Sequence, residues 1–260
     1  MVETVNKIII NADDFGLNES CTKAIVQAFS ENLISSTTAM ANGEFIEQAF
    51  TLAQENGFLD KVGIHINLTE GTPLTENIKS DAFFCENGKF HGRINRLKKP
   101  EKSQLAELKE EVTAQIERLK GIGFEIFHAD SHHHIHTDVY FEDTIKEVLF
   151  RFNVNKIRLH RNIGKIKFYK RIVKNIFNKT LKQQGFITTD KMGSMEDLAL
   201  YPDAAQKGVC EIMVHPDFDK NGRLIDRQGW DDDGYAFGEE LADIKKYLTG
   251  LKLVSYKELQ

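Results

Sequence analysis

The chain has 260 residues, of which 41% are hydrophobic and 28% charged, which suits one large globular domain or two small ones. A net charge of −5 gives no sign of nucleic-acid binding. Cys21, Cys85 and Cys210 are too few and too far apart for a disulfide framework and suggest a reducing compartment. No apolar stretch approaches transmembrane length and nothing resembles a signal peptide, so we expect a cytoplasmic protein.

Short apolar runs alternate with amphipathic helical stretches along the chain. In chain order we expect a strand at 7–10, a helix at 19–32, a strand at 34–40, a helix at 45–56 and a strand at 62–68, followed by a long loop or small insertion at 71–96. A helix at 101–121, a strand at 124–129, a helix at 141–151 and a strand at 157–159 come next. The chain then continues with a basic helix, a strand at 209–214, a helix near 237–248 and a last strand at 253–254. This alternation predicts a parallel sheet with helices outside it, in a single α/β domain over residues 1–260.

Five of the nine histidines lie between His128 and His136. Every second residue of this run is polar: His128, Asp130, His132, His134 and His136. An extended strand would place these five side chains on one face. So polar a face indicates a site rather than a core, and imidazole is the commonest ligand for transition metals. A tag or a solvated loop is the alternative. Asp130 either orients a ligating imidazole or belongs to a polar loop.

Other metal-type residues follow predicted strands. Asp13 and Asp14 come after the first strand, His65 lies near the end of the third, and His215 ends the strand at 209–214. Parallel α/β folds place their sites at the carboxyl ends of strands, so we expect these residues to converge with the histidine run. Taken alone, His65 or His215 would be read as a hydrogen-bonded core histidine.

Asp13 and Asp14 are adjacent carboxylates, which repel each other unless a cation or a proton separates their roles. One can bind a metal while the other stays free as a base, and Gly16 would help the chain to turn so that both reach one pocket. The alternative is that Asp13 or Asn18 caps the following helix. One Asp and two His with an open position form a workable catalytic metal site, for which ligand chemistry ranks Zn²⁺ above Mg²⁺.

Four segments together resemble a known family: 11–16 (Asn-Ala-Asp-Asp-Phe-Gly), 63–69 (Gly-Ile-His-Ile-Asn-Leu-Thr), 130–136 (Asp-Ser-His-His-His-Ile-His) and 213–216 (Met-Val-His-Pro). The sequence resembles the YdjC-type carbohydrate deacetylases, which include the chitooligosaccharide (diacetylchitobiose) deacetylases. The resemblance runs from residue 7 to at least 218 and is weak after Asp219. It implies a distorted seven-stranded β/α barrel similar to the polysaccharide deacetylases.

The resemblance also implies a mechanism. A divalent metal, Mg²⁺ in this family, would be held by Asp14, His65 and His132. Asp13 would be the general base and His215 the general acid in removal of N-acetyl groups from amino sugars or chito-oligosaccharides, with free and 6-phosphorylated sugars both open. The implied assembly is a homodimer, and the partner is a small sugar.

The resemblance leaves two histidines of the run without a defined role. His134 and His136 fit the family pattern, and we expect them beside the metal or the substrate. Two other functions stay open. One is a metal-dependent phosphoesterase, which would want more carboxylates for a second cation. The other is a non-catalytic module that binds sugar or metal.

Residues 151–182 contain eleven Lys or Arg and no Asp or Glu. A solvated amphipathic helix explains this pattern most simply, and a nucleic-acid or membrane patch is the less favoured alternative. Arg158, Arg161 or Lys165 could instead bind a sugar phosphate, or Arg158 could orient Asp13. Further on, residues 231–233 (Asp-Asp-Asp) suggest a solvated turn, and Trp230 and Tyr235 could stack on a sugar ring.

Overall fold

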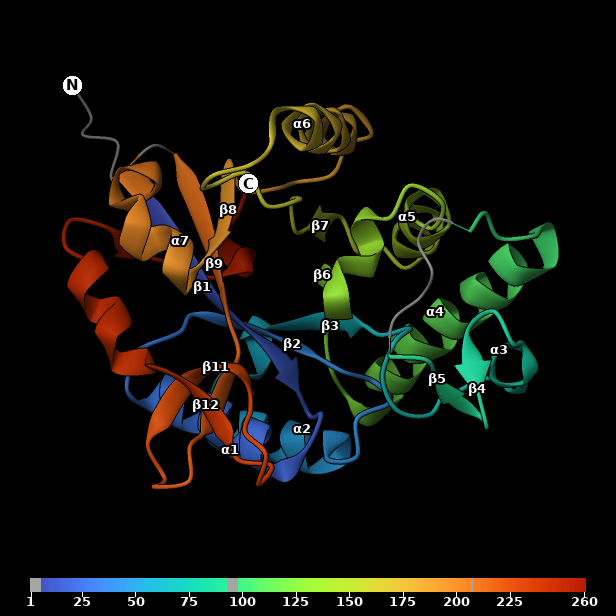
Figure 1. Ribbon diagram of the computed structural model, residues 1–260, viewed down its shortest axis with the longest axis horizontal. Helices are drawn as coiled ribbons and strands as arrows, with labels where there is room; N and C mark the ends of the chain where they lie inside the picture. The colour runs from blue at the N-terminus through green and yellow to red at the C-terminus, as the bar shows by residue number, and fades with distance from the viewer. Residues whose placement is uncertain (1–5, 93–97, 207) are drawn as a thin grey trace.

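The computed structural model describes residues 6–92, 98–206 and 208–260. Within these residues, seven parallel strands form a curled sheet with the spatial order β7 (Lys156–Ile157), β6 (His128–Ser131), β3 (Val62–Ile66), β2 (Ser36–Ala39), β1 (Lys7–Phe15), β9 (Val209–Val214) and β8 (Lys191–Ser194). β13 (Lys252–Leu253) pairs with the start of β1. Figure 1 shows β1 running through the middle of this sheet.

The two edges of the sheet approach each other. The N–H of Ile157, in β7, donates to the carbonyl of Ile187, and the N–H of Asn162 donates to the carbonyl of Met192, in β8. These bonds are irregular, so the sheet curls round without a continuous ladder between β7 and β8. The expected α/β class, a distorted seven-stranded β/α barrel, is confirmed.

Helices cover the outside of the sheet. They are α1 (Glu19–Ser30), α2 (Ile46–Glu55), α3 (Glu76–Ser80), α4 (Lys102–Ile122), α5 (Glu142–Arg151), α6 (Phe168–Gln183) and α7 (Met195–Leu200). In α4 the buried Leu108, Val112, Ile116 and Leu119 recur every three or four residues and form its inner face. None of the helices in the described ranges is long and apolar enough to cross a membrane.

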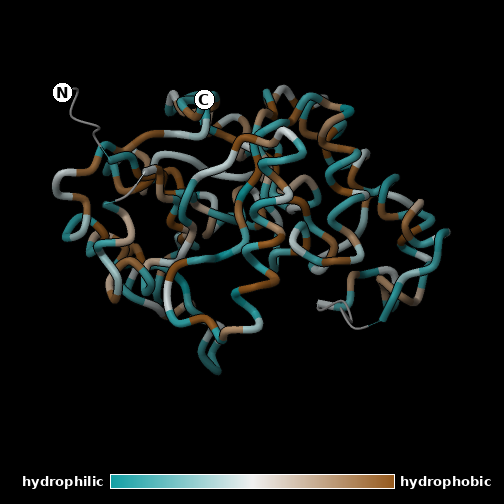
Figure 2. Tube along the Cα trace, turned by 90° about the horizontal axis from the view of Figure 1, so that it is seen from above, coloured by the Kyte–Doolittle hydropathy of each residue, from teal (hydrophilic) through white to brown (hydrophobic). Residues whose placement is uncertain are grey.

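The core has two parts because β1 is apolar on both faces, as expected for a strand inside a parallel sheet. Ile8 and Ile10 belong to the large cluster between sheet and helices. Ile9 belongs to a small cluster that is completed by Val254 and Tyr256 from the C-terminal segment. In Figure 2 apolar segments run mainly through the interior of the trace, and many of the turns at its edges are polar.

A second, antiparallel sheet follows the barrel and was missed by the sequence analysis. It consists of β10 (Pro216–Phe218), β11 (Leu224–Trp230) and β12 (Ala236–Glu240) in that order. The helix expected near 237–248 is therefore wrong: its first part is β12, and Leu241–Tyr247 is a 3₁₀ helix. The cross-strand bonds to β11 override the helical pattern of this segment.

Two other expectations need correction. The strand expected at 124–129 starts only at His128 and ends at Ser131, and His132–Thr137 is a 3₁₀ segment. The long loop expected at 71–96 contains α3 and a hairpin of β4 (Cys85–Glu86) and β5 (Lys89–Phe90). Residues 93–96 of that expected loop lie outside the described residues.

Candidate active site

A cavity of about 320 Å³ lies at the carboxyl ends of the strands. Asp13 and Asp14 reach it from the end of β1, His65 from β3, His132 from the turn after β6, and His215 from the residue after β9. The convergence expected from the positions of these residues along the chain is confirmed. The cavity lining is completed by Glu70, Ser131, His133, His134, Met213, Arg227, Gln228, Gly229 and Trp230.

Asp13 and Asp14 both face the cavity because the backbone leaves the regular strand between them. The pairing of β1 with β2 shifts register between Ala12 and Phe15, and Asp14 has a φ of 70°, in the left-handed region. Gly16, with a φ of 85°, continues the turn. The helix-cap alternative applies to Asn18, whose side chain accepts the N–H of Cys21, and not to Asp13.

Three donor atoms form a compact triangle in the cavity. Asp14 Oδ1 lies 3.2 Å from His65 Nε2 and 2.9 Å from His132 Nδ1, and the two nitrogens are 3.4 Å apart. Bonds of about 2.0–2.2 Å to one cation place neighbouring ligand atoms about 3.0–3.4 Å apart. The triangle therefore fits a single divalent cation, and these three buried residues could hold it.

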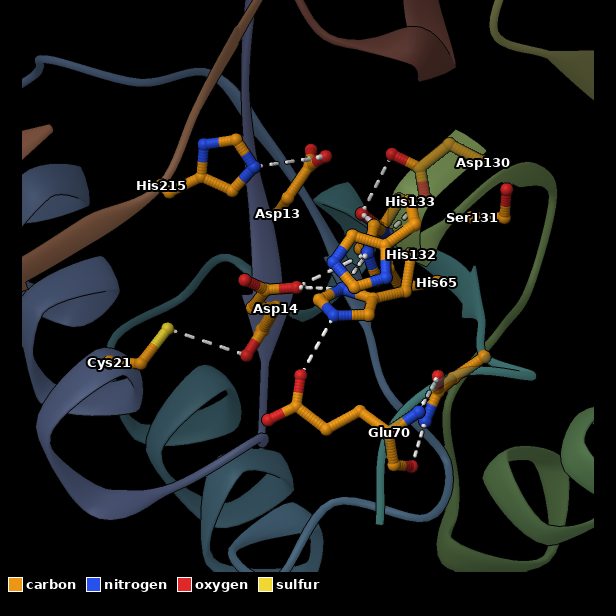
Figure 3. A network of polar contacts seen from close by, with 12 residues as sticks. Asp13, Asp14, Cys21, His65, Glu70, Asp130, Ser131, His132, His133 and His215 are labelled. Atoms are coloured by element: carbon orange, nitrogen blue, oxygen red, sulfur yellow. Dashed lines mark hydrogen bonds and ion pairs between the residues drawn. The ribbon is translucent and has the colours of Figure 1, made fainter. Parts of the chain in front are cut away.

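Both imidazoles are oriented by a carboxylate on their far side. His65 Nδ1 lies 2.6 Å from Asp130 Oδ1, and His132 Nε2 lies 2.8 Å from Glu70 Oε2 (Figure 3). Such a bond holds the proton on the outer nitrogen and turns the lone pair of the inner one toward the site. The position of Asp130 thus matches the expectation that it orients a ligating imidazole.

The same carboxylates change the acidity of both rings. Burial lowers the pKa of His65, but the charge of Asp130 and hydrogen bonds to Asp130 and Asp14 together raise it to about 10. Burial likewise opposes the charged form of His132, while Asp14 and Glu70 raise its pKa to about 9. A metal at this triangle must therefore compete with protons for the two nitrogens.

Asp13 is held by Arg158 and not by the triangle. Arg158 Nη1 and Nη2 each lie 2.7 Å from an oxygen of Asp13. Nη2 is also 2.7 Å from Asp130 Oδ2, and Nε is 2.7 Å from Glu211 Oε1. Burial opposes ionisation of Asp13, but the Arg158 charge holds its pKa well below the usual range, so Asp13 is a carboxylate at neutral pH.

Arg158 is fully buried among these three acids. Of the two roles that the sequence left open for Arg158, orienting Asp13 matches the structure. The guanidinium is buried among three carboxylates and is not exposed to a sugar phosphate. Arg161 pairs with Asp197 instead, and it lies with Lys165 outside the cavity lining. The phosphate hypothesis for the basic segment therefore finds no support in the described residues.

A second group of three metal-type residues, Asp13, His65 and Asp130, lies next to the triangle. Arg158 Nη2 contacts both Asp13 and Asp130 at 2.7 Å, so a guanidinium already bridges the carboxylates that a second cation would need. The donor set thus favours one cation over the two that many phosphoesterases use.

His215 lies next to Asp13 at the cavity. Its Nε2 lies 3.9 Å from Asp13 Oδ2, and its Nδ1 lies 3.9 Å from Asp226 Oδ1. Asp226 also accepts the backbone N–H of His215 at 2.7 Å, which fixes the segment after β9. The side chain is 30% exposed, so His215 is open to a ligand in the cavity.

The other histidines of the run separate in direction, so the single polar face expected for them is wrong. His133 and His134 have φ values of 51° and 56°, which break the strand after Ser131. His134 lines the cavity, and burial lowers its pKa to about 3. His136 turns inward to Ser131 Oγ and the carbonyl of Arg158, and His128 stacks on Tyr256 with ring centroids 4.3 Å apart.

Three residues near the cavity were missed by the sequence analysis. Arg227 Nη2 lies 2.8 Å from Asp14 Oδ2, and its Nη1 lies 2.9 Å from Asp217. No local pattern marks Arg227, since 213 residues separate it from Asp14. Glu70 directly follows the segment 63–69 and could have been noticed there. Asn11, whose Nδ2 lies 3.0 Å from Asp13 Oδ1, begins the segment 11–16.

This chain is similar to proteins of a known family. A model of the YdjC-like protein family matches residues 7–244. A carbohydrate deacetylase from Oceanobacillus iheyensis is 40% identical over 130 residues, which cover 50% of this chain and 55% of that relative. Carbohydrate deacetylase 1 from Listeria innocua is 36% identical over 135 residues, or 52% of this chain and 54% of the relative. The chain spans about half the length of the curated relatives it matches.

One solved structure shares the whole fold. A protein from Enterococcus faecalis V583, provisionally described as a cellobiose-phosphate cleavage protein, superposes with a TM-score of 0.75 over 98% of both chains at 23% sequence identity. The family match covers most of this chain and includes every residue placed in the cavity above. The chain therefore belongs to the YdjC-like family.

Proposed function

We propose that this chain is a metal-dependent hydrolase that removes the N-acetyl group from acetylated amino sugars, with chito-oligosaccharides as the expected class. One observation carries the proposal. The cavity places the donor triangle of Asp14, His65 and His132 beside a separate carboxylate, Asp13, which Arg158 fixes outside the triangle. Metal or sugar binding alone does not need that second carboxylate. The names of the curated relatives support the same activity.

A divalent cation held by Asp14, His65 and His132 would polarise an acetyl carbonyl as a Lewis acid and would lower the pKa of a water molecule. Asp13 then acts as the general base. Its Oδ1 accepts bonds from Arg158 and Asn11, whereas Oδ2 accepts one from Arg158 and faces His215. A carboxylate oxygen has two lone pairs, so Oδ2 keeps one to take the proton of the attacking water.

His215, next to Asp13 at the cavity, acts as the general acid. When the C–N bond of the acetamide breaks, the leaving nitrogen needs a proton. His215 Nε2 lies 3.9 Å from Asp13 Oδ2, so a reacting group that lies beside this pair can be within hydrogen-bond reach of both residues. The products are acetate and a sugar with a free amine.

The donor set and the family resemblance favour different cations. Two imidazoles and one carboxylate suit Zn²⁺, Co²⁺ or Mn²⁺ better than Mg²⁺, which prefers oxygen ligands. The family resemblance implies Mg²⁺. Elemental analysis of protein purified without chelator distinguishes these cations directly.

The activity is tested by acetate release from N-acetylated chito-oligosaccharides, with and without EDTA. Asp13→Asn should lower kcat by about 10²–10⁴-fold, the usual contribution of a general base, and leave metal content unchanged. Asp60→Asn, an exposed carboxylate paired with Lys257, is the matched control and should retain full activity. Absence of acetate release from every sugar tested would contradict the proposal, and sugar binding without release would favour a binding module.

Two further properties are proposals of the same kind. A cytoplasmic location is supported by Cys21, Cys85 and Cys210, which are free thiols, and cell fractionation tests it. A homodimer is supported by the family resemblance and by apolar side chains that α6 leaves exposed, including Phe168 and Val173. Light scattering on the purified chain tests the dimer.

A further inference from the structure

The cavity that contains the triangle adjoins a second one. An outer cavity of about 580 Å³ lies between the start of α1 and the antiparallel sheet, and Trp230 lines both cavities. Both volumes fall in the range of about 300–1,000 Å³ that is usual for small-ligand sites. A chain-like ligand could therefore occupy both cavities by passing along Trp230.

Arg227 packs against the ring of Trp230 and holds it in place. The guanidinium of Arg227 lies 4.4 Å from the centre of the indole ring. Arg227 is itself fixed by ion pairs to Asp14 and Asp217, and its side chain is only 7% exposed. The indole is nevertheless 53% exposed, so it offers a rigid apolar surface to a ligand at the site.

The outer cavity offers further features suited to a sugar. Tyr235, in the turn after Trp230, is 52% exposed and lines the outer cavity only. Hydrogen bonds from the N–H groups of Asp233 and Tyr235 to the side chain of Asp231 fix this turn. A pyranose ring has apolar C–H faces that pack on aromatic rings and hydroxyl groups that bond to polar walls.

The charges in the outer cavity are already neutralised. Lys23 pairs with Glu19 along α1, and Asp217 pairs with Arg227. A phosphate group would find there only a lysine that already has a partner. The walls therefore suit a neutral, polyhydroxylated ligand better than an anionic one.

We propose that the outer cavity is a subsite for the neighbouring sugar of an N-acetylated oligosaccharide, whose reacting acetamide lies beside Asp13 and His215 and whose chain passes over Trp230. The proposal rests on the deacetylase function proposed above. It assigns the contact with the second sugar, and with it discrimination by chain length, to Trp230 and Tyr235.

Trp230 is the only tryptophan of the chain, so intrinsic tryptophan fluorescence reports on this position alone. Asp13→Asn protein, in which turnover is suppressed, is titrated with N-acetylglucosamine, N,N′-diacetylchitobiose and N,N′,N″-triacetylchitotriose. We expect a saturable change in emission, with a Kd at least tenfold lower for the disaccharide than for the monosaccharide. Equal Kd values for the three sugars, or no response to any of them, would overturn the proposal.

Variants separate the two cavities. Tyr235→Ala retains the fluorophore and should raise the Kd for the disaccharide about fivefold without changing that for the monosaccharide. Phe237→Ala, in the adjacent strand and 48% exposed, lines neither cavity and is the matched control. An equal loss for both sugars in Tyr235→Ala would count against the subsite.

Activity provides an independent measurement. Trp230→Phe and Trp230→Ala should progressively reduce the ratio of kcat/KM for disaccharide over monosaccharide toward one, chiefly through KM. An unchanged ratio in both variants would refute the role of Trp230. Length-dependent fluorescence without acetate release from any sugar would support the subsite and overturn the deacetylase function, so the two proposals fail separately.

Discussion

Replacing Arg158 by methionine should destabilise the protein strongly, and more at neutral than at acidic pH. Arg158 is fully buried, and its three side-chain nitrogens lie 2.7 Å from oxygens of Asp13, Asp130 and Glu211. Removing one partner of a buried ion pair costs about 3–5 kcal/mol because the remaining charge stays desolvated. For 260 residues, with an unfolding entropy of about 2.1 cal/mol/K per residue, this corresponds to a loss of about 5–9 °C in Tm.

The pH dependence follows from the pKa of Asp13. In the wild type, Arg158 holds the pKa of Asp13 below its value in the unfolded chain. The pair therefore stabilises the fold fully at pH values above the unfolded-state pKa. This stabilisation is lost as the pH falls through the lowered pKa of the folded state. In Arg158→Met, burial without the cation should raise the pKa of Asp13 and of Glu211. The variant can relieve this by protonation, so its Tm deficit should be smaller at pH 5 than at pH 7.5.

Differential scanning calorimetry at these two pH values measures the effect. Arg118→Met is the matched control because Arg118 forms a surface pair with Glu47 at 2.8 Å, and its loss should change stability by at most about 1 kcal/mol. A Tm for Arg158→Met within about 2 °C of the wild type at both pH values would refute the reasoning. A deficit that grows on acidification would refute the assigned direction of the pKa shifts.

Three further predictions concern the triangle and its support. Asp14→Asn should weaken Mn²⁺ binding at least tenfold in isothermal titration calorimetry, since it removes the only anionic ligand; unchanged affinity would place the metal elsewhere. The Mn²⁺ affinity of the wild type should rise with pH up to about pH 9, because the raised pKa values of His65 and His132 make protons compete with the metal; an affinity independent of pH 6–9 would contradict this. Gly63→Ala should destabilise by about 1–3 kcal/mol in urea unfolding, because its Cβ would lie 2.5 Å from the ring and carbonyl of His128; a neutral effect would argue against this close packing.

Many strands of the barrel, and several residues of the site at their ends, could be predicted from the sequence because they depend on local patterns. β1 is a continuous apolar run followed by polar residues, and the later strands end in the same way, so the elements that carry Asp13, His65 and His215 could be predicted from the chain alone. The expected position of a site at the carboxyl ends of parallel strands then brings these residues together.

The turn after β6 could not be predicted in this way. The alternating histidines match the period of a strand, but His133 and His134 adopt left-handed conformations, and the chain curls into a 3₁₀ segment. Left-handed backbone at two successive non-glycine residues has no reliable sequence signature. The result is that His132 enters the triangle while His136 turns away from it.

The ion-pair partners of the site carboxylates could not be predicted from a single sequence. Arg227 meets Asp14 only because β11 of the second sheet packs over the end of β1, and the pattern of 237–248 gives no hint of that sheet. The bridging of Asp13, Asp130 and Glu211 by Arg158 likewise joins four different strands or strand ends. Such contacts come from tertiary packing and leave no periodic trace in the sequence.

The most direct test of the central claim is a crystal structure of the Mn²⁺-soaked protein with anomalous scattering data. The account predicts one anomalous peak about 2.0–2.3 Å from Asp14 Oδ1, His65 Nε2 and His132 Nδ1, with Asp13 still bound to Arg158 and outside the coordination sphere. A peak ligated by Asp13, or two peaks that displace Arg158, would contradict it.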